Sequence, residues 1–175
     1  MNNEKPGLIM VFTGDGKGKT TAAVGQAVRA LGHGYRVYMI HFMKGRDYGE
    51  FLATEHMPNL TVVRAGRDCF VCRDNPDPVD AELAREGFAQ AEKAILSGDY
   101  DMVVLDEINV AVDYGLIAEE DLLNLLKKKP DGVSVILTGR SASAELVKMA
   151  DMVSEVLAIK HHYDKGAEGC KGIEY

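Results

Sequence analysis

The chain has 175 residues, of which 46% are hydrophobic, so it carries enough apolar material for the core of one ordinary domain. Its 27 acidic residues outnumber its 20 basic ones, and the formal net charge of -7 disfavours general nucleic-acid binding while leaving room for a local anion pocket. The first residues do not resemble a signal peptide, no apolar run has membrane-spanning length, and three cysteines do not describe a disulfide framework. We therefore expect a cytoplasmic protein with neither a membrane nor a nucleic-acid partner.

Strands and helices are predicted to alternate along the chain. Apolar runs typical of buried strands are found at 8–12, 37–42, 60–63, 102–105, 133–137 and 153–159. Segments with helical spacing are found at 20–31, 80–96, 118–128 and 143–150. This alternation predicts an α/β fold with a mostly parallel sheet of about six strands flanked by helices. Because no linker marks a boundary, we predict a single domain over residues 1–175.

The helix expected at 80–96 is predicted to begin at Asp80 and to end before Gly98. The least regular stretch, 44–79, contains several glycines and prolines. We expect it to form loops across the ends of the strands, where ligands of open α/β sheets bind.

A glycine-rich segment, TGDGKGKT at 13–20, joins the first predicted strand to the first predicted helix. Its three glycines, Gly14, Gly16 and Gly18, allow the backbone to curl tightly and to point N–H groups at a phosphate, and the N-terminus of the following helix also favours anions. Lys19 is placed to contact phosphate oxygens. The segment therefore predicts a phosphate-binding loop of the P-loop class.

The neighbours of Lys19 bear on whether this turn is functional or merely structural. In the P-loop motif a hydroxyl at the position of Thr20 binds Mg²⁺. The strict motif has Gly where this chain has Thr13, so the match is imperfect. A structural turn does not explain Lys17 and Lys19 beside Thr20 and Thr21, and we interpret the segment as phosphate-binding.

Polar side chains also follow two of the later predicted strands. Asp106 and Glu107 come directly after the apolar strand at 102–105. This is how P-loop proteins deliver carboxylates to a metal beside the phosphates, and simple solvation of a strand end is the alternative. Arg140 follows the strand at 133–137 and could bind phosphate through its guanidinium, with a surface arginine beside a loop as an equal alternative.

The phosphate loop alone fits kinases, ATPases, GTPases and transferases, so other segments must decide among them. Five carry a resemblance: TGDGKGKTTAAVGQAVRALGHG at 13–34, HFMKGRDYGE at 41–50, VVLDEINVAVDYGLI at 103–117, LTGRSAS at 137–143 and ADMVSEVLAIKHHYDKGAEGCKGIEY at 150–175. Together they resemble the corrinoid adenosyltransferases of the CobA/CobO/BtuR type over nearly the whole chain. The last segment is the most discriminating, because a generic P-loop ATPase has no reason to end this way. The resemblance implies a RecA-like, P-loop NTPase-like fold.

The resemblance also implies an activity: transfer of the 5′-deoxyadenosyl group of ATP to the Co(I) of a reduced corrinoid, in adenosylcobalamin biosynthesis or salvage. The P-loop would hold the triphosphate in a reversed sense relative to ordinary ATPases, so that the ribose C5′ is exposed and triphosphate leaves as a unit. The catalytic residues would be Lys19, Thr20, Glu107 and Arg140, with Mg²⁺ held by Thr20 and Glu107. The nucleotide contacts would be Gly14, Asp15, Gly16, Lys17, Gly18, Lys19, Thr20, Thr21, Arg29 and Arg140.

On the corrinoid side the attacking atom would be cobalt, so no general base or protein nucleophile is needed. The resemblance implies that cobalt is reduced only after its lower axial ligand has left, and that apolar residues beneath the ring enforce this. Phe70 is the candidate for that role, although relatives often carry a Trp near the position of Cys72 and this chain has no Trp. A homodimer and a reductant protein as partner are further implications.

Two other functions stay open from the sequence: a P-loop ATPase or phosphotransferase, and a non-catalytic carrier that binds ATP and a corrinoid. Cys69 and Cys72 have the spacing of a metal or redox pair, but a zinc site needs two further ligands, so ordinary thiols are favoured. His161 and His162 are adjacent, and on an extended segment adjacent side chains point to opposite faces. We therefore expect these two histidines not to share a metal ion.

Overall fold

A six-stranded parallel sheet forms the centre of the protein. The computed structural model describes residues 6–45, 48–69, 71–166 and 169–174. The strands run in the order β3-β2-β4-β5-β1-β6, and every neighbouring pair is parallel. Their bounds are β1 Ile9–Thr13, β2 Val37–Phe42, β3 Leu60–Ala65, β4 Met102–Asp106, β5 Ser134–Thr138 and β6 Met152–Glu155. The predicted sheet is confirmed.

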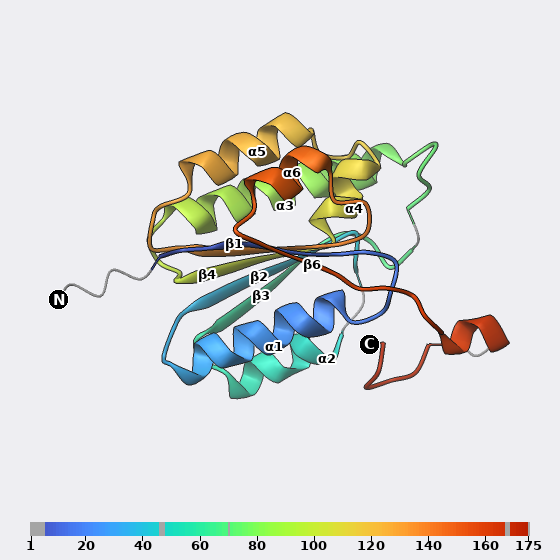
Figure 1. Cartoon of the computed structure of the whole chain (residues 1–175), viewed down its shortest axis with the longest axis horizontal. Coiled ribbons are helices and arrows are strands. Elements are labelled where there is room, and N and C mark those ends of the chain that lie inside the picture. The colour runs from blue at the N-terminus through green and yellow to red at the C-terminus, as the bar shows by residue number, and fades with distance from the viewer. Residues whose placement is uncertain (1–5, 46–47, 70, 167–168, 175) are drawn as a thin grey trace.

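Helices cover both faces of the sheet, with α1 and α2 on one face and α3, α4, α5 and α6 on the other (Figure 1). Their bounds are α1 Lys19–Gly32, α2 Gly49–Leu52, α3 Pro78–Leu96, α4 Ile108–Asp113, α5 Glu119–Lys128 and α6 Ala144–Met149, with 3₁₀-helices η1 Ala53–His56 and η2 His162–Lys165. The four predicted helices are confirmed as α1, α3, α5 and α6, whereas α2, η1, α4 and η2 were not predicted. In the part of the chain that the structure describes, no helix combines the length and apolarity needed to cross a membrane.

The central strands are buried on both faces because their alternate side chains enter two separate cores. In β4, Val103 and Leu105 pack in the core beneath α3 and α5, while Val104 packs in the core beneath α1. The α1 core uses small residues, Ala23 and Ala27, so the helix can lie close to the sheet. This close packing holds the first turn of α1 at the carboxyl edge of the strands.

Two predicted boundaries were wrong. The last strand, expected over 153–159, ends at Glu155, and all four of its residues are exposed because it lies at the sheet edge beside β1 alone. Helix α3 begins before Asp80: Asp77 caps it by accepting a hydrogen bond from the N–H of Val79 (2.9 Å). Asp80 is instead buried in the first turn and paired with the guanidinium of Arg67 (2.8 and 2.7 Å).

The segment after β6 departs from the extended conformation that the sequence suggested. His162 begins η2, so the chain turns between the two histidines, and the rings of His161 and His162 stack with centroids 4.6 Å apart. The expectation that these side chains point to opposite faces was therefore wrong, because it holds only for an extended backbone.

Candidate active site

The predicted phosphate loop lies between β1 and α1, at the carboxyl edge of the sheet. Gly18 has φ +121°, a conformation that favours glycine, and it precedes the first helical residue, Lys19. No side chain caps α1, and its first turn has no acidic residue. The N–H groups of this turn therefore face solvent and favour an anion.

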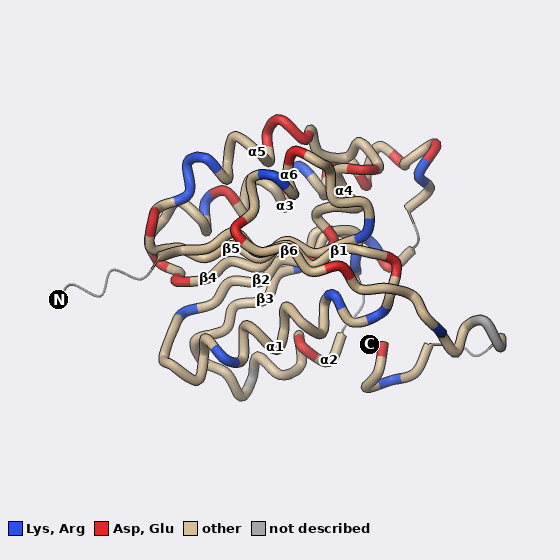
Figure 2. Tube along the Cα trace, in the orientation of Figure 1, with Lys and Arg blue, Asp and Glu red and all other residues tan. Residues whose placement is uncertain are grey.

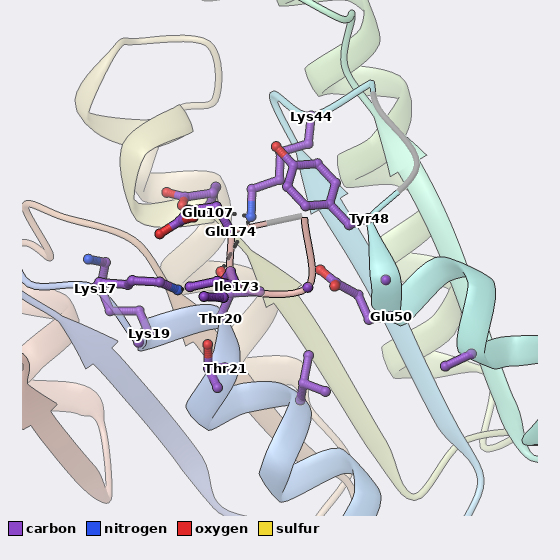
Figure 3. Close-up of a pocket in the computed structure, with 15 residues that line it drawn as sticks. Lys17, Lys19, Thr20, Thr21, Lys44, Tyr48, Glu50, Glu107, Ile173 and Glu174 are labelled. Carbon is purple, nitrogen blue, oxygen red and sulfur yellow. Dashed lines mark hydrogen bonds and ion pairs between the residues drawn. The ribbon is translucent and has the colours of Figure 1, made fainter. Parts of the chain in front are cut away.

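A cavity of about 530 Å³ opens in front of this loop. Its walls come from the start of α1, from the segment that follows β2, from Glu107 after β4, and from residues 172–174 of the C-terminal tail (Figure 3). Parallel strands bring these segments together because their carboxyl ends share one edge. The volume is in the range of small-molecule sites.

Asp106 is fully buried and contacts two residues of the cavity wall, Thr20 and Lys44. Its Oδ1 accepts hydrogen bonds from the hydroxyls of Thr20 (2.7 Å) and Thr138 (2.6 Å). Its Oδ2 contacts Lys44 Nζ (2.7 Å) and His41 Nδ1 (2.8 Å). Burial alone would raise the pKa of Asp106, but Lys44 and His41 outweigh that effect and hold the pKa well below its ordinary value. The carboxylate is therefore ionised and fixes the Thr20 hydroxyl at the start of α1.

The backbone of Glu107 is left-handed, with φ +61°. Its side chain therefore points in a different direction from that of Asp106. Its N–H donates to Thr138 Oγ1 (3.0 Å), and its side chain lines the cavity. Burial and the neighbouring Asp106 raise the pKa of Glu107, while Lys44, Lys19 and Arg140 oppose the rise. Lys44 Nζ lies 3.9 Å from Glu107 Oε1, and a further cation near this carboxylate would lower the cost of ionising it.

Basic groups face the cavity from several elements. Burial lowers the pKa of Lys19, Glu107 opposes this, and nearby Arg140 adds to it. Lys19 Nζ donates to the carbonyl of Gly16 (2.7 Å), and Lys17 Nζ donates to the carbonyl of Ile173 in the tail (2.7 Å). Figure 2 shows basic residues at the N-terminal end of α1, whereas both signs are mixed along most of the chain. Three lysines and three glutamates line the cavity, and Lys17 and Lys19 lie together where α1 begins.

The donor set suits a magnesium ion. A hydroxyl and a carboxylate, Thr20 and Glu107, both line the cavity, and oxygen ligands of this kind are those that Mg²⁺ prefers. The Thr20 hydroxyl donates to Asp106, which leaves an oxygen lone pair for the ion, and Lys44 Nζ lies 3.3 Å from Thr20 Oγ1. These residues therefore fit the ion.

Known proteins resemble this chain over nearly its whole length. A family model described as ATP:corrinoid adenosyltransferase BtuR/CobO/CobP matches residues 5–175. The chain belongs to this family. The corrinoid adenosyltransferase of Escherichia coli (strain K12) is 37% identical over 174 residues, covering 98% of this chain and 87% of that one. The corrinoid adenosyltransferase CobA of Salmonella typhimurium (strain LT2) is 36% identical, with the same coverage.

The crystal structure of the RadB recombinase has a TM-score of 0.53, covers 90% of this chain and 77% of its own, and is 18% identical. It supports the RecA-like fold alone. Family membership supports ATP-dependent adenosylation of corrinoids, and it does not favour the ATPase, phosphotransferase or carrier alternatives.

The structure brings together most residues predicted for the nucleotide site of this corrinoid adenosyltransferase. The cavity wall includes Lys17, Gly18, Lys19, Thr20, Thr21 and Glu107. Gly14 and Asp15 line a neighbouring hollow of about 460 Å³ beside β6 instead. Arg140 is exposed, yet it lies near enough to affect the pKa values of Lys19 and Glu107.

One described residue, Arg29, stands apart from this group. Arg29 is exposed on α1, donates to Gln26 Oε1 (3.1 Å), and does not line the cavity. About nine residues of helix separate it from Thr20, or roughly 13 Å. Phe70 lies outside the described residues. The nucleotide contact of Arg29 and the corrinoid contact of Phe70 stay predictions.

Sequence reasoning missed His41 and Lys44 as parts of the site. Their signal was available: a histidine interrupts the apolar run of β2, and a lysine follows the strand end next to β4. Tyr48 adds to this wall, with its ring 5.0 Å from Lys44 Nζ. The polar interruption of a strand buried on both faces was thus informative, because a buried polar group needs a partner.

The early glycines of the loop have a packing role that the sequence did not reveal. Gly16 donates its N–H to the carbonyl of Val156 (2.7 Å), and a Cβ there would lie 2.5 Å from the carbonyl oxygen of Leu157. A Cβ on Gly14 would lie 2.5 Å from the Val156 oxygen. Close contact with the segment after β6 therefore requires both glycines.

We expect Gly16→Ala to lower the free energy of unfolding by about 1–3 kcal/mol, because backbone must move to admit the methyl group. The matched control is Gly25→Ala in α1, where a Cβ meets nothing within 4 Å and alanine should add about 0.5–1 kcal/mol. Denaturant unfolding measures both. Equal, small effects at the two positions would contradict the packing role of Gly16.

Proposed function

We propose that this chain transfers the 5′-deoxyadenosyl group of ATP to the Co(I) of a reduced corrinoid, as an ATP:cob(I)alamin-type adenosyltransferase, and releases triphosphate. The proposal rests on one observation: the N-terminus of α1, which has no side-chain cap, meets Lys19 and Glu107 in the same cavity. The chain also belongs to the adenosyltransferase family. ATP and the corrinoid are the two substrates.

The reaction forms a Co–C bond and breaks the C5′–O bond of ATP. Co(I) supplies the electron pair for the new bond, and the pair of the broken bond leaves with the triphosphate. No proton needs to be abstracted, so the protein's task is to position the substrates and to stabilise the leaving group. The reversed placement of the triphosphate, with C5′ exposed, is part of this proposal.

The leaving triphosphate would be bound by the N–H groups at the start of α1, by Lys19 and by Arg140. Lys19 lies at the first helical residue, and its lowered pKa reflects a buried cation near another cation, Arg140. A polyanion between them would reverse that repulsion. Fixed positive groups that meet developing negative charge lower the barrier most effectively in a partly dehydrated site.

Thr20 and Glu107 would hold Mg²⁺. When bound, the ion would neutralise charge on triphosphate oxygens. Asp106 orients Thr20 through the 2.7 Å hydrogen bond and itself accepts a hydrogen bond from Lys44. Asp106 and Lys44 together therefore fix the position of Thr20. Asp106 is a positioning residue in this proposal.

Replacing Glu107 by Gln should separate activity from stability. We expect adenosyl transfer to fall by about 10²-fold, since a charged ligand near the leaving group is lost. We also expect stability at neutral pH to rise. The folded pKa of Glu107 is raised, so the folded state binds the proton more tightly than the unfolded state does.

The raised pKa of Glu107 predicts how the stability difference between the variant and wild type depends on pH. Ionising Glu107 costs wild type stability as pH rises from the ordinary value of 4.5 through the raised pKa, and the glutamine variant escapes this loss. The stability gain should therefore vanish below that window. Glu120→Gln, at an exposed position in α5, is the control. A variant less stable than wild type at every pH would contradict the argument.

A homodimer, a reductant protein that delivers cobalt as Co(I), and a cytoplasmic location complete the proposal. Reduction is needed because only Co(I) carries the nucleophilic electron pair, and no redox group of this chain is assigned to the task. Size-exclusion chromatography with light scattering tests the dimer.

An anaerobic assay tests the function. Protein, ATP, Mg²⁺ and chemically reduced cobalamin are combined, the light-sensitive Co–C product is followed by absorbance, and the phosphate products are identified. The proposal expects adenosylated corrinoid and triphosphate in equal amounts. ADP and phosphate would indicate a phosphotransferase or ATPase. Saturable binding without product, after cobinamide and the a,c-diamide have also been tried, would indicate a carrier.

A further inference from the structure

Three side chains in the C-terminal tail form a cluster that the adenosyl transfer does not use. His161, His162 and Glu174 are each half-buried, and one ligand atom from each lies within 4.8 Å of the others. The cluster combines two imidazoles with a carboxylate. This donor set suits Zn²⁺ and related transition metals and differs from the oxygen set expected for Mg²⁺.

The local fold brings these groups together. The turn into η2 stacks the rings of His161 and His162, with an interplanar angle of 25°. A second turn returns the chain, so that the N–H of Cys170 donates to Glu174 Oε2 (2.6 Å). Glu174 Oε1 is thereby directed to His162 Nε2, at a distance of 3.5 Å.

Two atoms of the cluster lack hydrogen-bond partners among the described residues. His162 Nε2 and Glu174 Oε1 are both shielded from solvent, yet neither makes a hydrogen bond. A buried polar group without a hydrogen-bond partner destabilises the fold, and a bound ligand would remove that cost. Their 3.5 Å separation is close to the roughly 3.4 Å expected between two ligands of one tetrahedral ion with ~2.1 Å bonds. His161 Nδ1 accepts a long hydrogen bond from the N–H of Tyr163 (3.3 Å), so an ion bound at Nδ1 would replace that hydrogen bond.

We propose that His161, His162 and Glu174 bind one divalent transition-metal ion of the Zn²⁺ class, which fastens the C-terminal tail over the nucleotide cavity. The tail is already part of that cavity: Gly172, Ile173 and Glu174 line it, and Lys17 holds the carbonyl of Ile173. The ion would join η2 to these last residues. It would therefore restrict the tail at the point where it covers the phosphate loop.

Direct metal titration tests the site without reference to activity. Protein freed of metal by chelation is titrated with Zn²⁺ in competition with a chromogenic chelator. We expect one ion per chain, with affinity at least tenfold lower in His162→Ala and in Glu174→Gln, and unchanged in His33→Ala, an exposed histidine at the end of α1. A stoichiometry far below one, or equal affinity in all four proteins, would overturn the proposal.

Amide hydrogen exchange tests whether the ion restricts the C-terminal tail. Zn²⁺ should slow amide exchange within 160–174 in wild type and should leave it unchanged in Glu174→Gln, which keeps the shape of the side chain and removes its charge. If His162 and Glu174 form only an ion pair, Zn²⁺ will not alter exchange in wild type and the proposal fails. Because neither experiment measures transfer, their outcome is independent of the adenosyltransferase assay.

Discussion

Lys19→Ala is expected to lower kcat/KM for adenosyl transfer by about 10²–10³-fold, the usual effect of removing one preorganised group that meets negative charge in the transition state. Lys19 begins α1, lines the cavity, and lies near both Glu107 and Arg140. The loss should appear in kcat as well as in KM, because charge on the triphosphate grows while the C5′–O bond breaks.

The control for this variant is Lys128→Ala, which removes the same charge from an exposed position in the last turn of α5. It should leave kcat/KM unchanged. Lys19→Ala should also fold normally, since burial disfavours the Lys19 cation and its removal relieves that cost. A loss below fivefold in Lys19→Ala, with triphosphate still released, would show that the P-loop lysine does not stabilise the leaving group.

Asp106→Ala is expected to lower the free energy of unfolding by about 3–5 kcal/mol, because it removes the buried carboxylate that pairs with the half-buried ammonium of Lys44. The hydroxyls of Thr20 and Thr138, and the ring of His41, lose the same acceptor. For a chain of this size such a loss lowers Tm by roughly 6–20 °C. Asp99→Ala, at an exposed turn, should change stability by less than about 0.5 kcal/mol.

A double variant identifies the cause. Lys44→Met combined with Asp106→Ala should be less destabilised than Asp106→Ala alone, because the unpaired charge is removed as well. Denaturant unfolding at pH 7 measures all of these proteins. Additive losses would contradict the pairing. In wild type, the stabilisation from ionised Asp106 is complete above the ordinary carboxyl pKa of 3.8 and declines as pH falls below it, since the folded pKa is depressed.

Local patterns were enough to predict the sheet and the phosphate loop. Each central strand is a short apolar run bounded by turn residues, and a parallel sheet buried on both faces produces such runs directly. The loop at 13–20 carries its own chemistry in consecutive residues. The carboxylates at 106 and 107 were recognised because they follow a strand, and their arrival at the same edge then follows from parallel topology.

The features of the site that could not be predicted from the sequence depend on contacts between distant segments. Gly16 packs against Leu157, and Lys17 holds Ile173, so both require the tail to return to the loop. His41 appeared to be one polar residue in an apolar strand until the structure placed it against Asp106. No periodicity encodes such pairings. The stacked histidines depended on a single turn of 3₁₀-helix, which the local sequence did not specify.

The roles of the two carboxylates illustrate the same limit. The strand-end pattern directed both carboxylates to a metal, and the family resemblance assigned only Glu107 to it. The structure separates them through the left-handed backbone at Glu107, which turns one side chain to the cavity while the other is buried under Thr20. A positive φ at a non-glycine residue is a tertiary outcome and has no local signature here.

In the proposed reaction, C5′ of ATP becomes bonded to cobalt while the three phosphates leave together. The most direct measurement of this transfer is a single-turnover reaction of the protein with ATP labelled with ¹³C at C5′ and with excess cob(I)alamin, under anaerobic conditions. We predict that the label appears in the Co–C bond of the corrinoid product and that phosphorus NMR shows one equivalent of triphosphate. Labelled ADP or unchanged labelled ATP, with no label on the corrinoid, would contradict adenosyl transfer to cobalt.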